Sequence, residues 1–191
     1  PTKSLKDQIV SAEVYLGAQP IVQALRDGAH IVVTGRIADP SIFAAPMMFE
    51  FGWGMEDYTR LGFANGIGHL MECGAQVTGG YFADPGRKDV PNPWDLAFPI
   101  AEVNEDGSAI ITKLEGTGGI VNTQTIKEQL WYEVHDPSNY ITPDVVVDFS
   151  TTKIEELSEN RVMISEISGK PRTPTLKVSI GCQEGFIGED M

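Results

Sequence analysis

The sequence has little positive charge, and this shortage narrows the class of protein it can be. Its 191 residues include 14 lysines and arginines against 27 aspartates and glutamates, a formal net charge of −13 at pH 7. Such a chain repels phosphate backbones and anionic lipids, so we expect neither a nucleic-acid partner nor a membrane partner. A small anionic substrate remains compatible with this charge if local donors bind it.

Cysteines and long apolar runs are also scarce. Cys73 and Cys182 show no CxxC or Cys–His spacing, so we predict two free thiols in a reducing cytoplasm and no metal site. No apolar run approaches the ~20 residues of a membrane-spanning helix, and no signal-peptide pattern is present. The chain begins at Pro1 without methionine and ends at Met191 just after an apolar run. We interpret both ends as cuts in a longer polypeptide.

The most distinctive segment that is present covers residues 66–76. Wound as an α-helix at about 100° per residue, it places His69, Glu72, Cys73 and Gln76 on one side, within an arc of roughly 100°. The opposite side is apolar. An imidazole beside a carboxylate can move a proton near neutral pH. We therefore predict His69 and Glu72 as catalytic and Cys73 and Gln76 as substrate-binding, the alternative being a polar face satisfied by neighbouring loop backbone.

The first half of the chain predicts an α/β arrangement. A helix over residues 20–26 precedes a β-branched run over residues 31–34, which is typical of a buried parallel strand. Arg36 follows in the exit loop, where ligands gather in open α/β sheets, and Asp39 follows as the N-cap of a second helix. A guanidinium can bind a carboxylate through two hydrogen bonds. We predict Arg36 and Asp39 as anion-binding residues, with capping alone as the alternative for Asp39.

The second half predicts mainly strands. A hairpin is expected around residues 104–107, a capping box at Thr125 and Glu128 starts one helix, and four β-type runs follow it. These runs cover residues 145–149, 153–157, 162–167 and 176–180. The predicted fold class is thus α/β in the first half and α+β overall. Residues 1–97 form the end of an α/β domain and residues 98–191 a β-rich lobe, or the two form one continuous domain.

A glycine-rich loop over residues 116–119 outlines an anion site. Glycines let backbone N–H groups approach an anion, the following helix start adds a favourable dipole, and a preceding lysine adds charge. The spacing matches neither a Walker A loop nor a dinucleotide fingerprint, and a glycine turn without a ligand is the alternative. A polar cluster at the end of the following helix is a further candidate, unless its histidine merely caps that helix. The predicted binding residues here are Lys113, Gly116, Gly118, Gly119, Glu128 and His135.

Several stretches of the sequence resemble the acyclic terpene utilisation (AtuA) family, and together they cover nearly the whole chain. They are residues 18–25, 31–40, 51–53, 68–82, 98–103, 116–119, 128–137 and 142–145. The resemblance implies a longer protein, with a glycine-rich α/β segment before this portion and more chain after it. It also implies a place in bacterial citronellol and geraniol breakdown, beside acyl-CoA enzymes and a small companion subunit or domain. It supplies no list of catalytic residues.

Together these features predict a cytoplasmic catabolic enzyme of hydratase, lyase or isomerase type. Its substrate is a small carboxylic acid or its CoA thioester, and no metal or cofactor is predicted. Arg36 and Lys113 would hold anionic groups, while Gln76 or a backbone N–H would stabilise the oxyanion. The alternative is a non-catalytic subunit that binds acyl-CoA or organises a degradation complex. We expect a homo-oligomer, with or without a small companion subunit.

Overall fold

The computed structural model of the chain describes residues 8–183 and residue 185. Within them lie four α-helices and nine strands in three antiparallel sheets, which confirms the predicted α+β class. The helices are α1 (Gln19–Arg26), α2 (Asp39–Phe51), α3 (Tyr58–Met71) and α4 (Thr123–Trp131). The strands are β1 (Ile9–Val14), β2 (Pro99–Val103), β3 (Ser108–Lys113), β4 (Tyr140–Ile141), β5 (Val146–Asp148), β6 (Lys153–Ser158), β7 (Arg161–Ser165), β8 (Ser168–Lys170) and β9 (Val178–Cys182).

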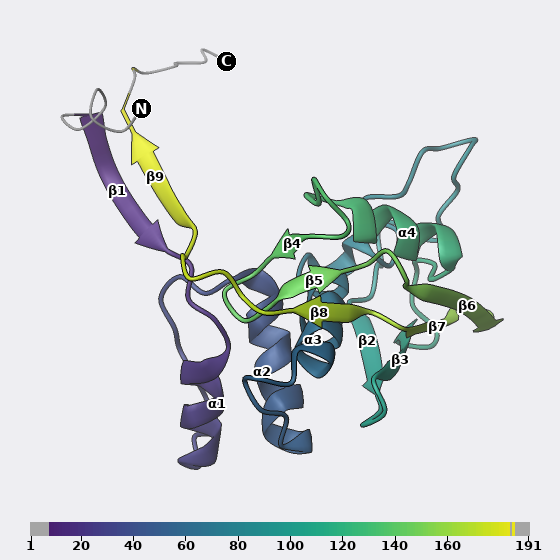
Figure 1. Cartoon of the computed structure of the whole chain (residues 1–191). Helices are drawn as coiled ribbons and strands as arrows, with labels where there is room; N and C mark the ends of the chain where they lie inside the picture. Colours follow the sequence, from purple (N-terminus) through teal and green to yellow (C-terminus); the bar gives the residue numbers. More distant parts are fainter. Residues whose placement is uncertain (1–7, 184, 186–191) are drawn as a thin grey trace.

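Helix α3 lies at the centre of the fold. The Asp57 side chain accepts a hydrogen bond from the backbone N–H of Arg60 at 3.2 Å and caps the first turn. Every residue from 61 to 70 is buried, packed by α2 and by strands β5 and β8 (Figure 1). A Cβ at Gly62 would lie 2.3 Å from the carbonyl oxygen of Ser168, so only glycine allows this contact. Packing, rather than helix propensity, therefore stabilises this glycine-rich helix.

The predicted helix over residues 66–76 is wrong in its second half. Helix α3 ends at Met71, and Gly74 has a φ of 55°, the left-handed conformation that terminates helices. Residues 74–76 then form a short 3₁₀ turn. Of the four polar residues predicted to share one helix face, only His69 lies within α3.

The predicted parallel strand over residues 31–34 is also wrong. No strand forms there, and the side chains of Ile31 and Val33 are 86% and 92% exposed. β-branched residues favour a strand only where a neighbouring strand completes the ladder, and none lies beside this segment in the described chain. The first half therefore contributes helices α1, α2 and α3 and the strand β1. Ala38 is the N-cap of α2 and no side chain caps it, so the predicted capping by Asp39 is wrong.

The second half follows the prediction more closely. The β2–β3 hairpin turns at residues 104–107, and strands β5, β6, β7 and β9 overlap the four predicted runs. Strands β2, β3, β7 and β6 form one sheet in that order, and β4, β5 and β8 form a second. Helix α4 begins earlier than predicted, because its N-cap is Asn122 and not Thr125. The Asn122 side chain accepts hydrogen bonds from the N–H groups of Gln124 and Thr125, both at 2.9 Å.

One hydrophobic core contains residues of both predicted regions. Phe63 and Ile67 of α3 belong to the same buried cluster as Ile111 of β3 and Ile164 of β7. The division after residue 97 stays a prediction, alongside the alternative of one continuous domain.

Strands β1 and β9 form a two-stranded antiparallel ribbon that extends away from the rest of the chain (Figure 1). Val14 pairs with Val178, and the N–H of Tyr15 donates to the carbonyl oxygen of Lys177 at 2.9 Å. The ribbon thus brings residues from the start and the end of the chain together beside α2.

The buried carboxylate of Asp144, in the β4–β5 turn, connects this turn to two helix starts. Its oxygens accept hydrogen bonds from the N–H of Ala18 at 2.8 Å and from the Ser41 hydroxyl at 2.6 Å. Ala18 immediately precedes α1, and Ser41 lies in the first turn of α2. Burial raises the pKa of Asp144, and the two hydrogen bonds oppose that rise. This connection fixes β4 against the start of α2.

Candidate functional site

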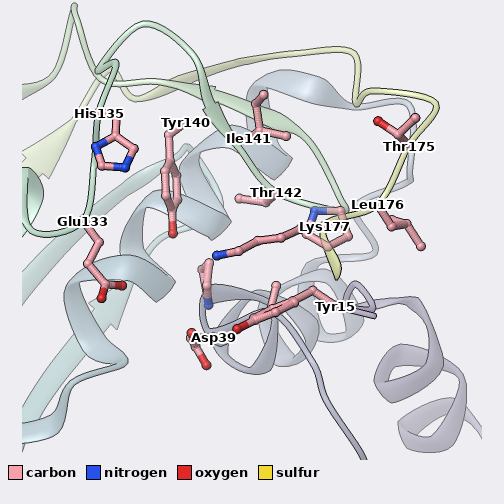
Figure 2. Close-up of a pocket in the computed structure, with 13 residues that line it drawn as sticks. Tyr15, Asp39, Glu133, His135, Tyr140, Ile141, Thr142, Thr175, Leu176 and Lys177 are labelled. Carbon is pink, nitrogen blue, oxygen red and sulfur yellow. The ribbon is translucent and has the colours of Figure 1, made fainter. Parts of the chain in front are cut away.

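A cavity of about 390 Å³ lies where the β1–β9 ribbon meets α2 and β4, within the size range of small-ligand sites. Figure 2 shows the Lys177 amine and the Tyr140 hydroxyl pointing towards its middle. The carboxylates of Asp39 and Glu133 face the same space (Figure 2). These four groups come from three parts of the sequence, because Glu133 and Tyr140 both lie in the stretch that runs from the end of α4 into β4. The other polar residues in the cavity wall are Tyr15, His135, Thr142 and Thr175.

Lys177 supplies the positive charge of this cavity. Its Nζ lies 4.7 Å from the centre of the Tyr15 ring, a cation–π contact. Within the described residues no carboxylate lies within 4.0 Å of this nitrogen. An ammonium that is positioned by an aromatic ring but has no close counter-ion can bind an anionic group of a ligand.

Tyr140 supplies a hydrogen-bond donor. Burial raises the pKa of its phenol well above the usual value, and the nearby carboxylates of Glu72, Asp39 and Glu133 raise it further. The hydroxyl is therefore protonated throughout the physiological pH range. A protonated phenol in a cavity can donate to a carbonyl oxygen that becomes negative during a reaction.

Glu133 has a strained backbone. Its φ is 57°, a left-handed value that costs a residue with a side chain about 1–3 kcal/mol. The residue follows the C-terminal end of α4, and its side chain lines the cavity. Strain of this kind concentrates at functional sites, because the rest of the fold must hold the residue in place.

The predicted catalytic residue His69 lies behind the cavity and not in its wall. It is 2% exposed, and its ring centre lies 5.1 Å from that of Tyr140 and 6.0 Å from that of Phe149. Burial lowers its pKa and keeps the imidazole neutral, although the carbonyl of Gln129 opposes this. Its Nε2 has no hydrogen-bond partner among the described residues. His69 therefore supports Tyr140, and its own catalytic role stays a prediction.

Glu72 and Cys73 face a different hollow, of about 480 Å³, which Phe43 and Phe98 also line. The Cys73 thiol donates to Oε1 of Glu72 at 3.0 Å. Burial raises the pKa of Glu72, and burial together with Glu72 raises the pKa of Cys73 to about 12. Cys73 is thus a protonated donor and not a thiolate nucleophile. Gln76 lies in the 3₁₀ turn, and its buried Nε2 has no partner among the described residues.

Cys73 is expected to react slowly with iodoacetamide in the folded protein. At pH 8 the raised pKa leaves roughly 10⁻⁴ of the thiol ionised, and the higher nucleophilicity of such a thiolate offsets only part of this loss. In a Cys182→Ser variant we expect alkylation roughly 100-fold slower than for the same protein in denaturant. Glu72→Gln should speed the folded reaction, because it removes the negative charge beside the thiol. Equal rates in folded and denatured protein would contradict this description.

Of the predicted pair Arg36 and Asp39, the fold brings only one residue into the cavity wall. Asp39 lines the cavity, whereas Arg36 lies outside its wall. The Arg36 guanidinium also packs on the Tyr15 ring, 4.9 Å from its centre, and its Nε lies 3.5 Å from the Glu13 carboxylate. Arg36 therefore supports the cavity by holding Tyr15, and a direct contact with substrate stays a prediction.

Backbone N–H groups of the glycine-rich loop donate hydrogen bonds to other parts of the protein. The N–H of Gly118 donates to the carbonyl oxygen of Asp95 at 2.9 Å, and that of Gly119 donates to Pro91 at 2.7 Å. The Lys113 ammonium donates to the carbonyl oxygen of Thr117 at 2.7 Å. These bonds leave no N–H of Gly118 or Gly119 for an anion. Anion binding by Lys113 and Gly116 stays a prediction.

Of the remaining candidates, His135 lines the cavity and Glu128 does not. The Glu128 carboxylate pairs with Nζ of Lys88 at 2.6 Å, in a separate hollow beside α4. The structure thus places Asp39 and His135 together in the cavity, with His69 behind it and the other candidates elsewhere.

Sequence reasoning missed Lys177 and Tyr140 and gave Glu133 no specific role. Glu133 belongs to the polar cluster at the end of the predicted helix, and that cluster was itself a candidate binding site. Tyr140 lies in a short strand and Lys177 beside β9, where neither has a motif. Only the pairing of β1 with β9 brings Lys177 to the cavity, and no local pattern predicts such distant pairing.

Across residues 8–183 and 185, no group of three or more His, Cys, Asp or Glu side chains is arranged to hold a metal ion. In the same residues, no helix has both the length and the apolar character needed to cross a membrane.

The comparison with known families confirms the resemblance seen in the sequence. The model of the family described as acyclic terpene utilisation family protein AtuA matches residues 1–191. No curated protein and no solved structure matches the chain. The match extends over the full sequence, and so over every residue of the cavity just described. This chain belongs to the acyclic terpene utilisation family.

Proposed function

We propose that this chain carries the carboxylate-binding and proton-transfer site of a catabolic enzyme, of hydratase, lyase or isomerase type. The observation that carries the proposal is the meeting of Lys177, Tyr140 and the strained Glu133 in one cavity. The substrate is a small carboxylic acid or its acyl-CoA form, in acyclic terpene or related carboxylate degradation. Family membership supports the pathway, and the cavity supports the chemistry.

Each of the three side chains has a role in this proposal. Lys177 binds the carboxylate of the substrate, and the Tyr140 hydroxyl donates to its reacting carbonyl oxygen. Glu133 removes a proton from the carbon beside that carbonyl, and the C–H electron pair moves towards the oxygen. If Glu133 returns the proton to another carbon, the reaction is an isomerisation. If it gives the proton to a departing hydroxyl group, water leaves and a double bond forms.

The cellular setting is part of the same proposal. We place the protein in the cytoplasm, as a homo-oligomer with or without a small companion subunit. The strong exposure of Ile31 and Val33 supports an oligomer, because large apolar side chains close together on a surface are typical of contact sites.

Proton exchange in D₂O tests this function without knowledge of the full reaction. We expect the protein to catalyse deuterium incorporation beside the carbonyl in a panel of small carboxylic acids and CoA thioesters, followed by proton NMR. Glu133→Gln should slow this exchange by roughly 10²- to 10⁴-fold, the usual effect of removing a general base. Glu105→Gln, in the exposed β2–β3 turn, is the matched control and should exchange normally.

Two outcomes would overturn the proposal. Normal exchange in Glu133→Gln would remove Glu133 from the reaction. Saturable binding of an acid or thioester with no exchange under any condition would favour the non-catalytic acyl-binding subunit instead.

A further inference from the structure

A second hollow, of about 570 Å³, lies beside α4, and its lining residue Tyr132 directly precedes Glu133 of the carboxylate cavity. One wall is the exposed face of α4, and the other comes from the long loop that follows residue 80 and runs past this helix (Figure 1). The Lys88–Glu128 ion pair, at 2.6 Å, joins the loop to the helix. We call this hollow the α4 groove. It shares no lining residue with the carboxylate cavity.

Aromatic rings line the α4 groove. Trp131 and Tyr81 are 63% and 54% exposed, although tryptophan is on average a highly buried residue in folded proteins. The Tyr81 ring meets the Tyr132 ring edge to face, with centres 5.4 Å apart, which holds Tyr81 in place. Phe82 lies buried among them. The groove therefore offers rigid ring faces against which a planar group can stack.

The charge of the α4 groove is positive in an otherwise acidic protein. Lys88 neutralises Glu128 and also lies 4.7 Å from the centre of the Phe82 ring. Lys127 also lines the groove, and no carboxylate of the described residues lies within 4.0 Å of it. One positive charge is left over, in a chain whose net charge is −13. Its position favours a ligand that carries an anionic group next to its planar part.

Three residues on one face of α4 combine these properties. Gln124, Lys127 and Trp131 follow one another at intervals of three and four residues, so their side chains line the same side of the helix. Aromatic rings stack on bases, and lysine binds phosphate as a point charge. Lys127 and Trp131 lie about one helical turn apart, which suits the phosphate and the base of one nucleotide. Gln124 lies beyond Lys127, on the side away from Trp131, where its amide can donate to a phosphate oxygen.

We propose that the α4 groove binds a nucleotide, with the base stacked on Trp131 and a phosphate at Lys127. The ligand is a small nucleotide and not a nucleic acid, because the net charge repels a polyanion. It is either a free nucleotide or the adenosine bisphosphate end of a CoA thioester. This inference does not depend on the proposed proton transfer, because the groove and the carboxylate cavity share no lining residue.

Fluorescence and calorimetric titrations with ADP and with adenosine 3′,5′-bisphosphate test the proposal. We expect saturable quenching of tryptophan fluorescence and a matching heat of binding. Trp131→Ala and Lys127→Ala should each weaken binding at least tenfold, about 1.4 kcal/mol. Both residues are exposed, so the variants should keep their folded circular dichroism spectrum. Trp94→Phe, in an exposed loop outside the groove, is the matched control and should bind normally.

Each outcome has a defined meaning. Tighter binding of the 3′,5′-bisphosphate identifies a CoA-type ligand, and tighter binding of ADP identifies a free nucleotide. No saturation below about 10 mM, full affinity in Trp131→Ala, or equal binding of inorganic phosphate would overturn the proposal. Lys177→Met should keep nucleotide binding, so that failure of the carboxylate site and failure of the α4 groove are told apart.

Discussion

Lys177→Met is expected to weaken the binding of small carboxylates by roughly 30- to 150-fold, equivalent to about 2–3 kcal/mol. Among the described residues that line the cavity, Lys177 is the one lysine or arginine, and two carboxylates, Asp39 and Glu133, face the same space. Without Lys177 an anionic ligand meets only negative charge there. Methionine keeps most of the length of the side chain, so packing changes little. Thermal-shift or calorimetric titration of the protein with carboxylic acids measures the loss.

Stability separates this effect from damage to the fold. Lys177→Met removes one exposed cation–π contact with Tyr15, which is worth about 0.5–1 kcal/mol. The unliganded protein should therefore unfold at almost the same temperature as the wild type. Lys153→Met is the control, because Lys153 pairs with Glu166 and does not line the cavity, so this variant should bind carboxylates normally. Unchanged affinity in Lys177→Met would exclude Lys177 as the anion-binding group.

Asp144→Ala is expected to destabilise the protein by about 3–5 kcal/mol. The substitution leaves the N–H of Ala18 and the hydroxyl of Ser41 buried without their acceptor, and it opens a small cavity. Because the same carboxylate positions β4 against α2, carboxylate binding should fall as well. Urea unfolding at pH 7 gives the free-energy change.

Two further variants test whether the loss of stability comes from the buried hydrogen bonds of Asp144. Asp144→Asn keeps an oxygen acceptor and a similar volume, so it should recover most of the lost stability. Asp148→Ala removes a carboxylate that is hydrogen-bonded to Ser150 and paired with Lys170 at 3.1 Å near the surface, and it should cost no more than about 1 kcal/mol. Similar losses for Asp144→Ala and Asp148→Ala would show that the buried connection is not what stabilises the helix starts.

Local sequence patterns correctly predicted the elements that are determined by their own turn and cap residues. The β2–β3 hairpin and helix α4 form where turn and cap residues mark them, with the cap of α4 displaced to Asn122. The run over residues 31–34 failed because β-branched residues need a neighbouring strand, which one sequence does not reveal. The prediction of a helix over residues 66–76 was wrong in its second half. The helical pattern placed Gly74 on the apolar face, but Gly74 adopts a left-handed conformation.

The candidate site shows the same contrast between features that a local pattern predicts and features that depend on distant contacts. The chemistry-bearing segment around His69 was recognised by residue type, but the fold buries His69 and turns Glu72 towards another hollow. Asp39 and His135 were predicted from polar residues that follow a loop arginine or a helix end, and both line the cavity, while their binding roles stay predictions. Lys177 has no distinctive neighbours, and its role follows only from the pairing of the two ends of the described chain. Contacts between distant strands decide this site, and spacing in the sequence does not encode them.

A crystal structure of the protein with a bound small carboxylate tests the central claim most directly. We predict that the carboxylate lies in the cavity between the ribbon and β4, with an oxygen at about 3 Å from Nζ of Lys177. The reacting carbonyl should lie within hydrogen-bonding distance of the Tyr140 hydroxyl. A carboxylate bound instead at Arg36 or at the 116–119 loop, with the cavity empty, would contradict this account of the site.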